Sequence, residues 1–250
     1  MKWQCNIKIS TLWILVLPLI CFTSFVSVYI HVLFMLFFHE WMHILMAFFF
    51  KVRVQQIIIY PFGMCAKFHG FGFGVPIQEG IIAMMGILSH GFIAFFLYLF
   101  LSLDLISNVY FQYLWDVNIG LALFNMIPIY PLDGFRIIQA FLHQIFPYRL
   151  AYHYMLICSI VFLFLNYRIW MMSISSFMIA LLSLIMDIQM LIHRHQNIRN
   201  FYWYRYLHPF QGVVKYHRKD DIYRGYENYL FYQENFHHET KWLYEKLAKW

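Results

Sequence analysis

The residues best suited to chemistry lie in Met35–Phe49, which reads MLFFHEWMHILMAFF. His39, Glu40 and His43 form an H-E-x-x-H pattern inside this otherwise apolar run. Residues four apart lie on one face of a helix, so the two histidines can present imidazole nitrogens to one metal ion. Glu40 would lie beside that ion and could take a proton from its water. This spacing is typical of a zinc hydrolase.

The same pattern has a purely structural explanation, namely a pair of helix-packing histidines beside a hydrogen-bonded glutamate. A charged side chain in the middle of a membrane span costs on the order of 3 kcal/mol. That cost favours a functional role for Glu40.

A second motif, NMIPIYPLDG, occupies residues 125–134. Pro128 and Pro131 cannot continue a helix, and Gly134 allows a tight turn after Asp133. A carboxylate at such a broken helix end could supply the third protein ligand that a catalytic zinc site needs beside its open position. The alternative is that Asp133 caps a helix starting at Phe135.

The composition indicates a polytopic membrane protein. The chain of 250 residues is 62% apolar and only 12% charged, whereas a soluble domain usually carries about 25% charged residues. Its four cysteines form no C-x-x-C pair, which argues against a disulfide framework or a thiolate metal site. We interpret the net charge of +6 as a topology signal. The expected surroundings are therefore a lipid bilayer, and no nucleic-acid partner is expected.

The apolar runs predict an all-α fold with about six transmembrane helices, since a helix needs about 20 apolar residues to cross a bilayer. Two of these helices lie in residues 10–50, and the others at 81–101, 109–128, 151–167 and 170–191. Lys2 and Lys8 precede the first run and imitate a signal peptide, but no cleavage pattern follows them. We therefore expect an uncleaved first span.

The basic residues indicate the orientation of these spans. With the N-terminus inside, seventeen of the eighteen Lys and Arg residues fall on the inner side, and only Arg168 falls outside. This positive-inside pattern predicts cytoplasmic N- and C-termini. It also places the HEWMH end of the second span and the 125–134 motif on the same, cytoplasmic side.

Two segments lie outside the predicted spans, namely a predicted hairpin and a C-terminal tail. Val54–Phe71 contains a β-branched run, a Pro-Phe-Gly break and a second strand-like piece, which predicts a short β-hairpin at the inner membrane surface. An irregular amphipathic connector is the alternative. We divide the chain into a transmembrane domain, residues 1–192, and a small basic and aromatic cytoplasmic tail, residues 193–250.

The remaining polar residues are given structural roles. Asp116 and Asn118 are expected to hydrogen-bond between helices. His90 is interpreted as a packing or hydrogen-bonding residue rather than a metal ligand. We expect the following at the membrane interface or the surface: Asp187, His31, His69, His143 and His153.

Together these motifs resemble the site-2 protease family of intramembrane zinc metalloproteases. HExxH in one span and N-x-x-P-x-x-P-L-D-G in a later span carry the resemblance, which covers roughly residues 5–205. The YPFG hairpin and the GILSHG segment further resemble the sporulation branch of the family. The resemblance implies six spans, a site open to the cytoplasm, and a helical substrate segment that is cut near the membrane surface.

The resemblance also implies roles for particular residues. Zn²⁺ would be held by His39, His43 and Asp133, with Glu40 as general base. The residues expected to shape the substrate side or the backbone are Asn125, Pro128, Pro131 and Gly134. The sequence departs from the family at two positions: in the third span Ile87 follows Gly86 where proline is common, and Met64 replaces a hairpin glycine. The tail is too short for a complete CBS domain, although residues 220–238 resemble the start of one.

The function implied is an intramembrane zinc endopeptidase of regulated proteolysis, acting on a sporulation sigma-factor precursor of the pro-sigma-K type. By resemblance it would lie in the membrane around the developing forespore and be held inactive by small membrane proteins. One alternative is a related protease that cuts anti-sigma factors or signal-peptide remnants. The other is a non-catalytic membrane scaffold that binds zinc structurally.

Overall fold

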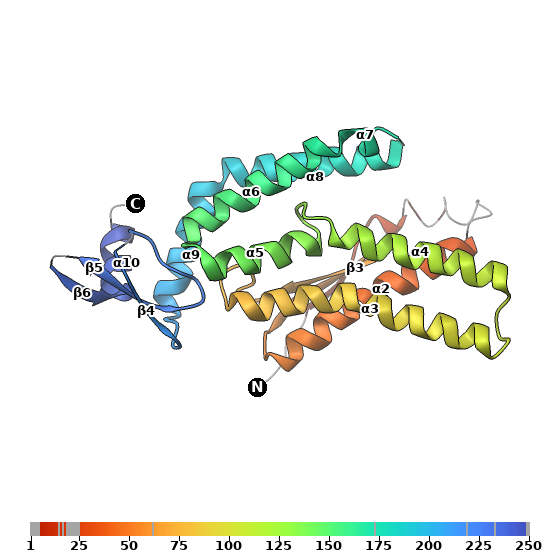
Figure 1. Cartoon of the computed structure of the whole chain (residues 1–250), viewed down its shortest axis with the longest axis horizontal. Helices are drawn as coiled ribbons and strands as arrows, with labels where there is room; N and C mark the ends of the chain where they lie inside the picture. Colours follow the sequence, from red (N-terminus) through yellow and green to blue (C-terminus); the bar gives the residue numbers. More distant parts are fainter. Residues whose placement is uncertain are drawn as a thin grey trace. The chain divides into compact units, whose positions relative to one another are not determined.

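A computed structural model describes residues 6–14, 16, 18, 26–61, 63–172, 174–218, 220–232 and 234–248 (Figure 1). It is mostly helical and contains two three-stranded sheets among these residues. The chain forms two compact units. The first consists of Met1–Phe71 and Ile81–Ile127, and the second of Gly72–Gly80 and Pro128–Trp250.

Three long helices build most of the first unit: α2 (Val26–Phe49), α3 (Pro76–Ser102) and α4 (Asn108–Met126). Pro76 begins α3, a position where its missing N–H is not needed. The side chain of Ser107 caps α4 by accepting a hydrogen bond from the Tyr110 N–H. Helix α4 ends where Ile127 turns extended, because the following proline disfavours a helical conformation for that residue.

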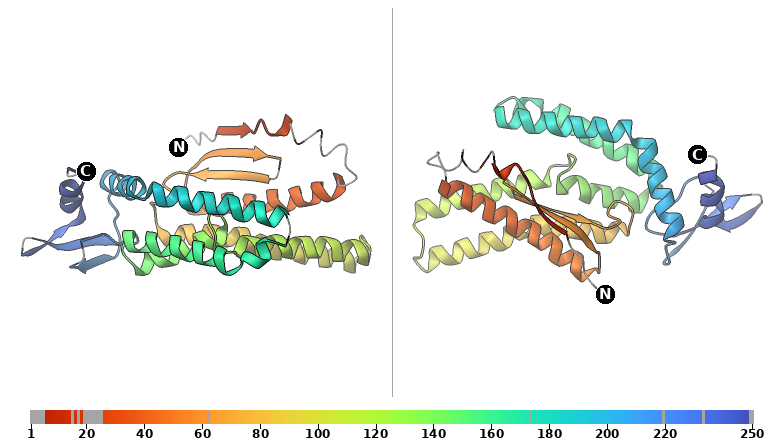
Figure 2. Two further views of the ribbon diagram at one scale, coloured as in Figure 1. Left: turned by 90° about the horizontal axis from the view of Figure 1, so that it is seen from above. Right: turned by 180° about the vertical axis from the view of Figure 1, so that it is seen from behind.

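A small sheet packs with these helices. Its strands β1 (Asn6–Ile9), β2 (Val54–Tyr60) and β3 (Gly63–Phe68) lie in the order β1-β2-β3, with β1 parallel and β3 antiparallel to β2 (Figure 2). Gly63 has a φ of 132°, a conformation that only glycine adopts readily. The predicted hairpin is thus confirmed. The pairing of β1 was not predicted, because a four-residue exposed strand has no hydrophobic pattern of its own.

The second unit contains further helices and the second sheet. Its elements are α5 (Asp133–Ile145), α6 (Tyr148–Leu165), α7 (Tyr167–Trp170), α8 (Ile174–Ile192), α9 (Arg194–Leu207), β4 (Val214–His217), β5 (Glu227–Tyr232), β6 (Asn235–His238) and α10 (Glu239–Ala248). Strand β4 pairs parallel with β5, and β5 antiparallel with β6. The aromatic tail therefore forms a folded sheet and helix rather than an extended segment.

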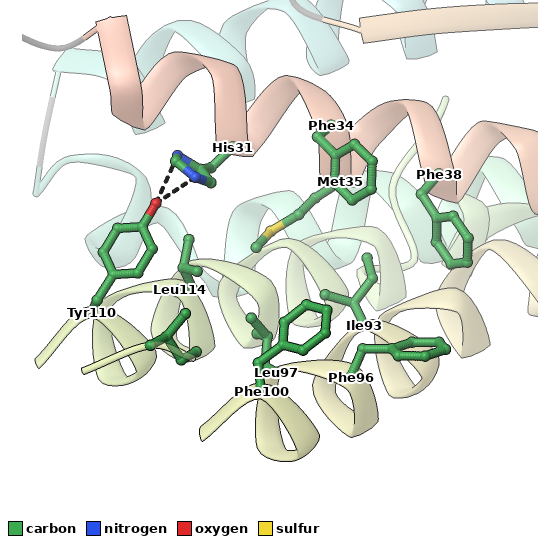
Figure 3. A pocket seen from close by; sticks show the side chains of 11 residues that line it. His31, Phe34, Met35, Phe38, Ile93, Phe96, Leu97, Phe100, Tyr110 and Leu114 are labelled. Atoms are coloured by element: carbon green, nitrogen blue, oxygen red, sulfur yellow. Dashed lines mark hydrogen bonds between the residues drawn. The ribbon is translucent and has the colours of Figure 1, made fainter. Parts of the chain in front are cut away.

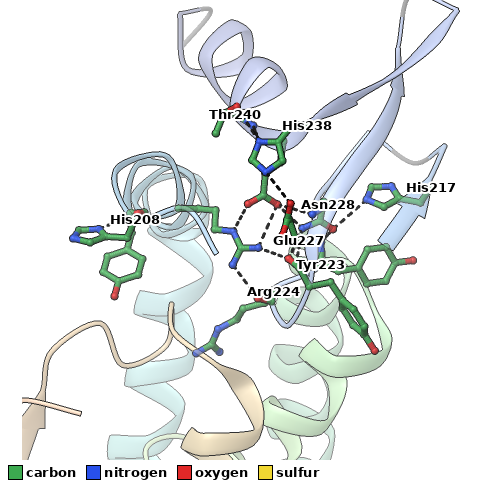
Figure 4. Close-up of polar contacts among 12 residues, drawn as sticks. His208, His217, Tyr223, Arg224, Glu227, Asn228, His238 and Thr240 are labelled. Carbon is green, nitrogen blue, oxygen red and sulfur yellow. Dashed lines mark hydrogen bonds and ion pairs between the residues drawn. The ribbon is translucent and has the colours of Figure 1, made fainter. Parts of the chain in front are cut away.

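Buried contacts hold this tail together. Its apolar core includes Phe201, Tyr202, Ile222, Leu230 and Leu243, all at most 2% exposed. The buried polar groups are paired with one another. Arg205 Nε donates to Glu239 Oε1 at 2.6 Å, and Asn228 Nδ2 donates to Glu239 Oε2 at 2.6 Å. Figure 4 shows these contacts around Asn228. Each buried charge thus has a partner, as burial requires.

Several helices are long and apolar enough to cross a membrane, and the chain is an integral membrane protein. These helices are α2, α3 and α6, with the pair α8 and α9, bent by 65°, as a fourth candidate. Six spans are not established. Helix α4 coincides with the fourth expected span but carries several polar residues, and most of the first expected span lies outside the described residues.

The structure corrects two expectations about polar residues. Asp187 and His143 were expected at the interface or surface, yet both are fully buried. Asp187 faces α6, where Ser159 donates a hydrogen bond to it, and His143 stacks on Tyr148 with ring centroids 4.8 Å apart. The expectation was wrong because a sequence shows that a residue is polar but not which neighbouring helix covers it.

Candidate metal centre

His39, Glu40 and His43 lie together on α2, and one ligand atom from each lies within 4.8 Å of the others. The two histidine Nε2 atoms are 3.1 Å apart, and both side chains are buried. Two nitrogen ligands bound tetrahedrally at about 2.0–2.1 Å would be about 3.3 Å apart. The donor set therefore fits a single zinc ion.

The orientation of His43 is fixed from α3. His43 Nδ1 lies 2.7 Å from the backbone oxygen of Ile82, to which it can only donate. The proton therefore resides on Nδ1, and Nε2 offers its lone pair. A hydrogen bond of this kind on the far ring nitrogen is what usually orients a metal-binding histidine.

Gly86 on α3 leaves the space that both imidazoles occupy. A Cβ atom there would lie 2.1 Å from His43 Cε1 and 2.8 Å from His39 Cε1, so any side chain would displace the two rings. In the sequence, Gly86 stands out only for the isoleucine that follows it, and its role beside the imidazoles was not predicted. The signal that could have found it is a glycine within a long apolar helix, where it weakens the helix and usually has a packing or functional reason.

The hairpin holds Glu40. The backbone N–H of Ala66 on β3 donates to Glu40 Oε1 at 2.6 Å. Strand β3 is an edge strand of its sheet and packs against α2. An edge strand leaves every second N–H directed away from its partner, and Ala66 uses this outward donor to orient the carboxylate.

His90 on α3 and Asn118 on α4 form a hydrogen-bonded pair, and His90 lies next to His39. His90 Nδ1 lies 2.8 Å from Asn118 Oδ1, and Asn118 Nδ2 donates to the His90 carbonyl at 2.8 Å. The ring centroid of His90 is 5.2 Å from that of His39. The structure thus confirms both as hydrogen-bonding residues between helices. Asp116, by contrast, is exposed.

Asp133 lies in the second unit, where it is the first residue of α5 and only 7% exposed. The N-cap residue is Leu132, so the alternative that Asp133 caps a helix starting at Phe135 is wrong. A carboxylate in the first turn of a helix is stabilised by the helix dipole. The group that clusters within the described residues comprises the two histidines and Glu40, and the ligand role of Asp133 stays a prediction.

The other residues of the second motif lie along the chain from the last turn of α4 to the first turn of α5. Asn125 Nδ2 donates to the Leu121 carbonyl of its own helix at 3.0 Å. Pro128 and Pro131 lie in the irregular segment between α4 and α5, and Gly134 is buried in the first turn of α5. Their substrate-side or structural role stays a prediction.

A separate apolar cavity of about 440 Å³ lies among α2, α3 and α4 (Figure 3). Its lining residues are His31, Phe34, Met35, Phe38, Ile93, Phe96, Leu97, Phe100, Ile106, Tyr110 and Leu114. The polar pair in this lining, His31 and Tyr110, is hydrogen-bonded. His31 precedes His39 by two helical turns, or about 12 Å along the axis. None of His39, Glu40 and His43 lines the cavity, although its lining residue Phe38 directly precedes His39.

Comparisons with known proteins support the resemblance to site-2 proteases. Residues 102–166, which include the second motif, match the model of Peptidase family M50. "Stage IV sporulation protein FB" of Bacillus subtilis (strain 168) is 22% identical over 151 residues, which cover 60% of this chain and 52% of that protein. The chain thus spans about half the length of this curated relative.

The fold is similar to that of a solved structure, the site-2 protease from Methanocaldococcus jannaschii. The TM-score is 0.55 with 22% sequence identity, and the alignment covers 76% of this chain and 92% of the other. The resemblance to the site-2 protease family is thereby confirmed. Residues 102–166 thus match peptidase family M50, and the chain has a fold similar to that of a site-2 protease.

Proposed function

We propose that this chain is an intramembrane zinc endopeptidase of the site-2 protease type. The observation that carries the proposal is the pair of buried Nε2 atoms, 3.1 Å apart, with the Glu40 carboxylate beside them. The resemblance to Peptidase family M50 supports it. A packing role for the histidines would not require a glutamate at this depth.

His39, His43 and Asp133 would hold the zinc ion. Asp133 is proposed because its motif recurs in the family and because its buried carboxylate follows a broken helix end. When bound, zinc supplies Lewis acidity, which polarises a peptide carbonyl and acidifies water. Two neutral imidazoles and one carboxylate are a donor set that zinc accepts, and they leave one position open.

Glu40 acts as general base and then as general acid. Its carboxylate takes a proton from the attacking water and passes that proton to the leaving amine. The N–H of Ala66 holds Oε1 at 2.6 Å and so keeps the carboxylate in place during both transfers. Asn125 fixes the end of α4 through its bond to Leu121, or turns to donate to the developing oxyanion.

The substrate is a membrane-associated protein whose cleaved segment must unwind, because helical peptide bonds are hydrogen-bonded internally. Strand β3 has an outer edge on which the unwound segment can pair at positions other than the Ala66 N–H, which holds Glu40. From the sporulation relative we propose a sigma-factor precursor of the pro-sigma-K type, with small membrane proteins as inhibitors. We further propose cytoplasmic termini, with residues 1–192 as the protease and 193–250 as its tail.

The test begins with metal content. We expect about one zinc per chain in detergent-purified protein, and loss of zinc in His43→Ala and Asp133→Ala but not in the control His195→Ala, which alters an exposed tail histidine. Glu40→Gln should keep zinc and lose cleavage of a co-expressed pro-sigma-K-type precursor. Bound zinc with no hydrolysis by the wild type would instead favour the structural-zinc scaffold.

A further inference from the structure

Asp187 on α8 is a fully buried carboxylate that the proposed mechanism does not use. Ionisable groups within membrane segments are costly, and those present usually serve a function. Its Oδ2 accepts a hydrogen bond of 2.6 Å from the Ser159 hydroxyl on α6, while its Oδ1 has no hydrogen-bond partner among the described residues. Packing of α6 against α8 does not require a half-satisfied carboxylate, which calls for an explanation.

The Ser159 hydroxyl has a second contact, and that contact leads to the irregular segment Pro128–Leu132. The backbone N–H of Tyr130 donates to Ser159 Oγ at 3.3 Å. A hydroxyl has one proton and two lone pairs, so donation to Asp187 leaves the lone pairs of Oγ to accept from Tyr130. The two hydrogen bonds run in the same direction and strengthen each other.

The segment Pro128–Leu132 determines where α5 begins. Ile129 is 1% exposed, and its carbonyl accepts a hydrogen bond of 2.8 Å from the Leu132 N–H. The Tyr130 ring packs edge-on against Phe135 in the first turn of α5, with centroids 5.3 Å apart. Asp133 follows Tyr130 by three residues, so displacement of the Tyr130 backbone would move the Asp133 carboxylate.

We propose that Asp187, acting through Ser159, is a positioning residue that holds the Tyr130 backbone and thereby places Asp133 for metal binding. All of these residues belong to the second unit. The inference rests on the proposed function for the role of Asp133, but the hydrogen-bonded chain from Asp187 to Tyr130 can be tested without metal. Figure 1 shows α6 and α8, which carry Ser159 and Asp187, running side by side.

Four variants of the full-length chain separate positioning from packing. Asp187→Asn keeps the shape and an oxygen acceptor for Ser159, whereas Asp187→Leu keeps the approximate volume and removes the acceptor. Ser159→Ala removes the hydroxyl itself. Ser183→Ala is the matched control, because Ser183 is also a buried serine, 5% exposed, on α8.

The first measurement is hydrogen exchange of the peptide that covers residues 128–134, in metal-free detergent-solubilised protein. We expect faster exchange in Asp187→Leu and Ser159→Ala, because the Tyr130 N–H loses its anchored acceptor. The wild-type rate should persist in Asp187→Asn and Ser183→Ala. Unchanged exchange in both Asp187→Leu and Ser159→Ala would overturn the proposal.

The second measurement is titration with Co²⁺, whose visible absorption reports the ligand geometry. Asp187→Leu and Ser159→Ala should bind Co²⁺ roughly 10-fold more weakly with an altered spectrum, as is usual when a ligand loses its support. Asp187→Asn should bind Co²⁺ with the affinity and spectrum of the wild type. Asp133→Ala shows the affinity and spectrum that result when the Asp133 carboxylate is absent.

The two measurements together distinguish the possible failures. Faster exchange with unchanged Co²⁺ affinity and spectrum would overturn the positioning role, since the segment would be held without consequence for the metal. Absence of Co²⁺ binding by the wild type would overturn the proposed function and with it the placement of Asp133 for metal. The exchange rates would still decide whether Asp187 holds Tyr130.

Discussion

The Arg224 guanidinium pairs with the Glu79 carboxylate in the interior of the second unit, with side-chain exposures of 0% and 7%. The pair has backbone partners as well. Arg224 Nε donates to the Gly74 carbonyl at 2.9 Å, and the Gly72 N–H donates to Glu79 Oε1 at 2.9 Å. The glycine-rich residues 72–74, which precede α3, are thus linked to the tail through buried, charge-assisted hydrogen bonds. Such bonds are stronger than those between neutral groups.

Removal of one partner of this pair should be strongly destabilising. We expect Glu79→Gln to lower the free energy of unfolding by about 3–5 kcal/mol, because it leaves the Arg224 charge buried and unpaired. The measurement is thermal unfolding in detergent. The control Lys246→Met breaks the exposed pair with Asp220 and should cost less than about 1 kcal/mol. Equal losses in the two variants would contradict the prediction.

Acid should destabilise the second unit through His143. Burial, aided by the charge of Arg224, lowers the pKa of His143 well below its usual value. In the unfolded chain His143 takes up a proton near pH ~6.5, whereas in the folded chain it stays neutral at that pH. The free energy of unfolding therefore falls as the pH drops below that value. The slope is about 1.4 kcal/mol per pH unit, down to the folded pKa.

The variant His143→Phe tests this titration, because it keeps an aromatic ring against Tyr148 but cannot take up a proton. As the pH falls from 7 to 5, the thermal midpoint of the wild type should fall more than that of the variant. The two midpoints therefore converge if the variant is less stable at pH 7. If the two are equally stable at pH 7, the variant becomes the more stable protein at pH 5. Parallel curves over this range would show that another group controls the acid sensitivity.

Substitution of Gly86 should weaken metal binding without disrupting the fold. Gly86→Ala places a Cβ 2.1 Å from the His43 ring, which forces the imidazole away from its partner. We expect zinc affinity to fall by at least about 10-fold, comparable to the loss of a supporting group. The control is Gly91→Ala on the same helix, where an added Cβ meets nothing within 4 Å. Zinc competition with a chelator measures both, and equal affinities would contradict the role of Gly86.

The N–H of Ala66 should matter for cleavage and not for zinc. Ala66→Pro removes the donor to Glu40 Oε1, and proline is tolerated on the outer side of an edge strand. We expect cleavage to slow by on the order of 10²-fold, because the base is no longer held in position. Ala66→Gly keeps the N–H and should retain most activity. A parallel loss of zinc in Ala66→Pro would point to collapse of the hairpin instead.

The features that could be predicted from the sequence are those that depend on the spacing of residues close together in the chain. The separation of His39 from His43 on one helix was enough to bring their nitrogens to 3.1 Å, and the β-branched run after Val54 was enough to define the hairpin. What it missed depends on contacts between distant segments. The close approach of Gly86 to the imidazoles, the burial of His143 and the contact of Asp187 with Ser159 all join different helices.

The tail sheet was missed for a related reason. Its strands are short and rich in aromatic residues, and residues 218–226 separate β4 from its partner β5 in the sequence. Parallel pairing of this kind leaves no hairpin signal in the sequence. The tail is also held by polar contacts such as that of Arg205 with Glu239. Contacts of this kind cannot be predicted from the hydrophobic periodicity of the sequence.

The stacking of Tyr148 on Phe201, with ring centroids 3.6 Å apart and planes inclined by 9°, means that the tail is not a detachable module. Tyr148 is the first residue of α6, and its N–H donates to the carbonyl of Ile222. Proteolytic removal of the chain beyond residue 193 would expose the N-terminal end of α6, a candidate membrane helix, because Phe201 would no longer cover Tyr148. Anything that binds or remodels the tail therefore acts on α6 directly, by mechanical connection rather than through a flexible tether.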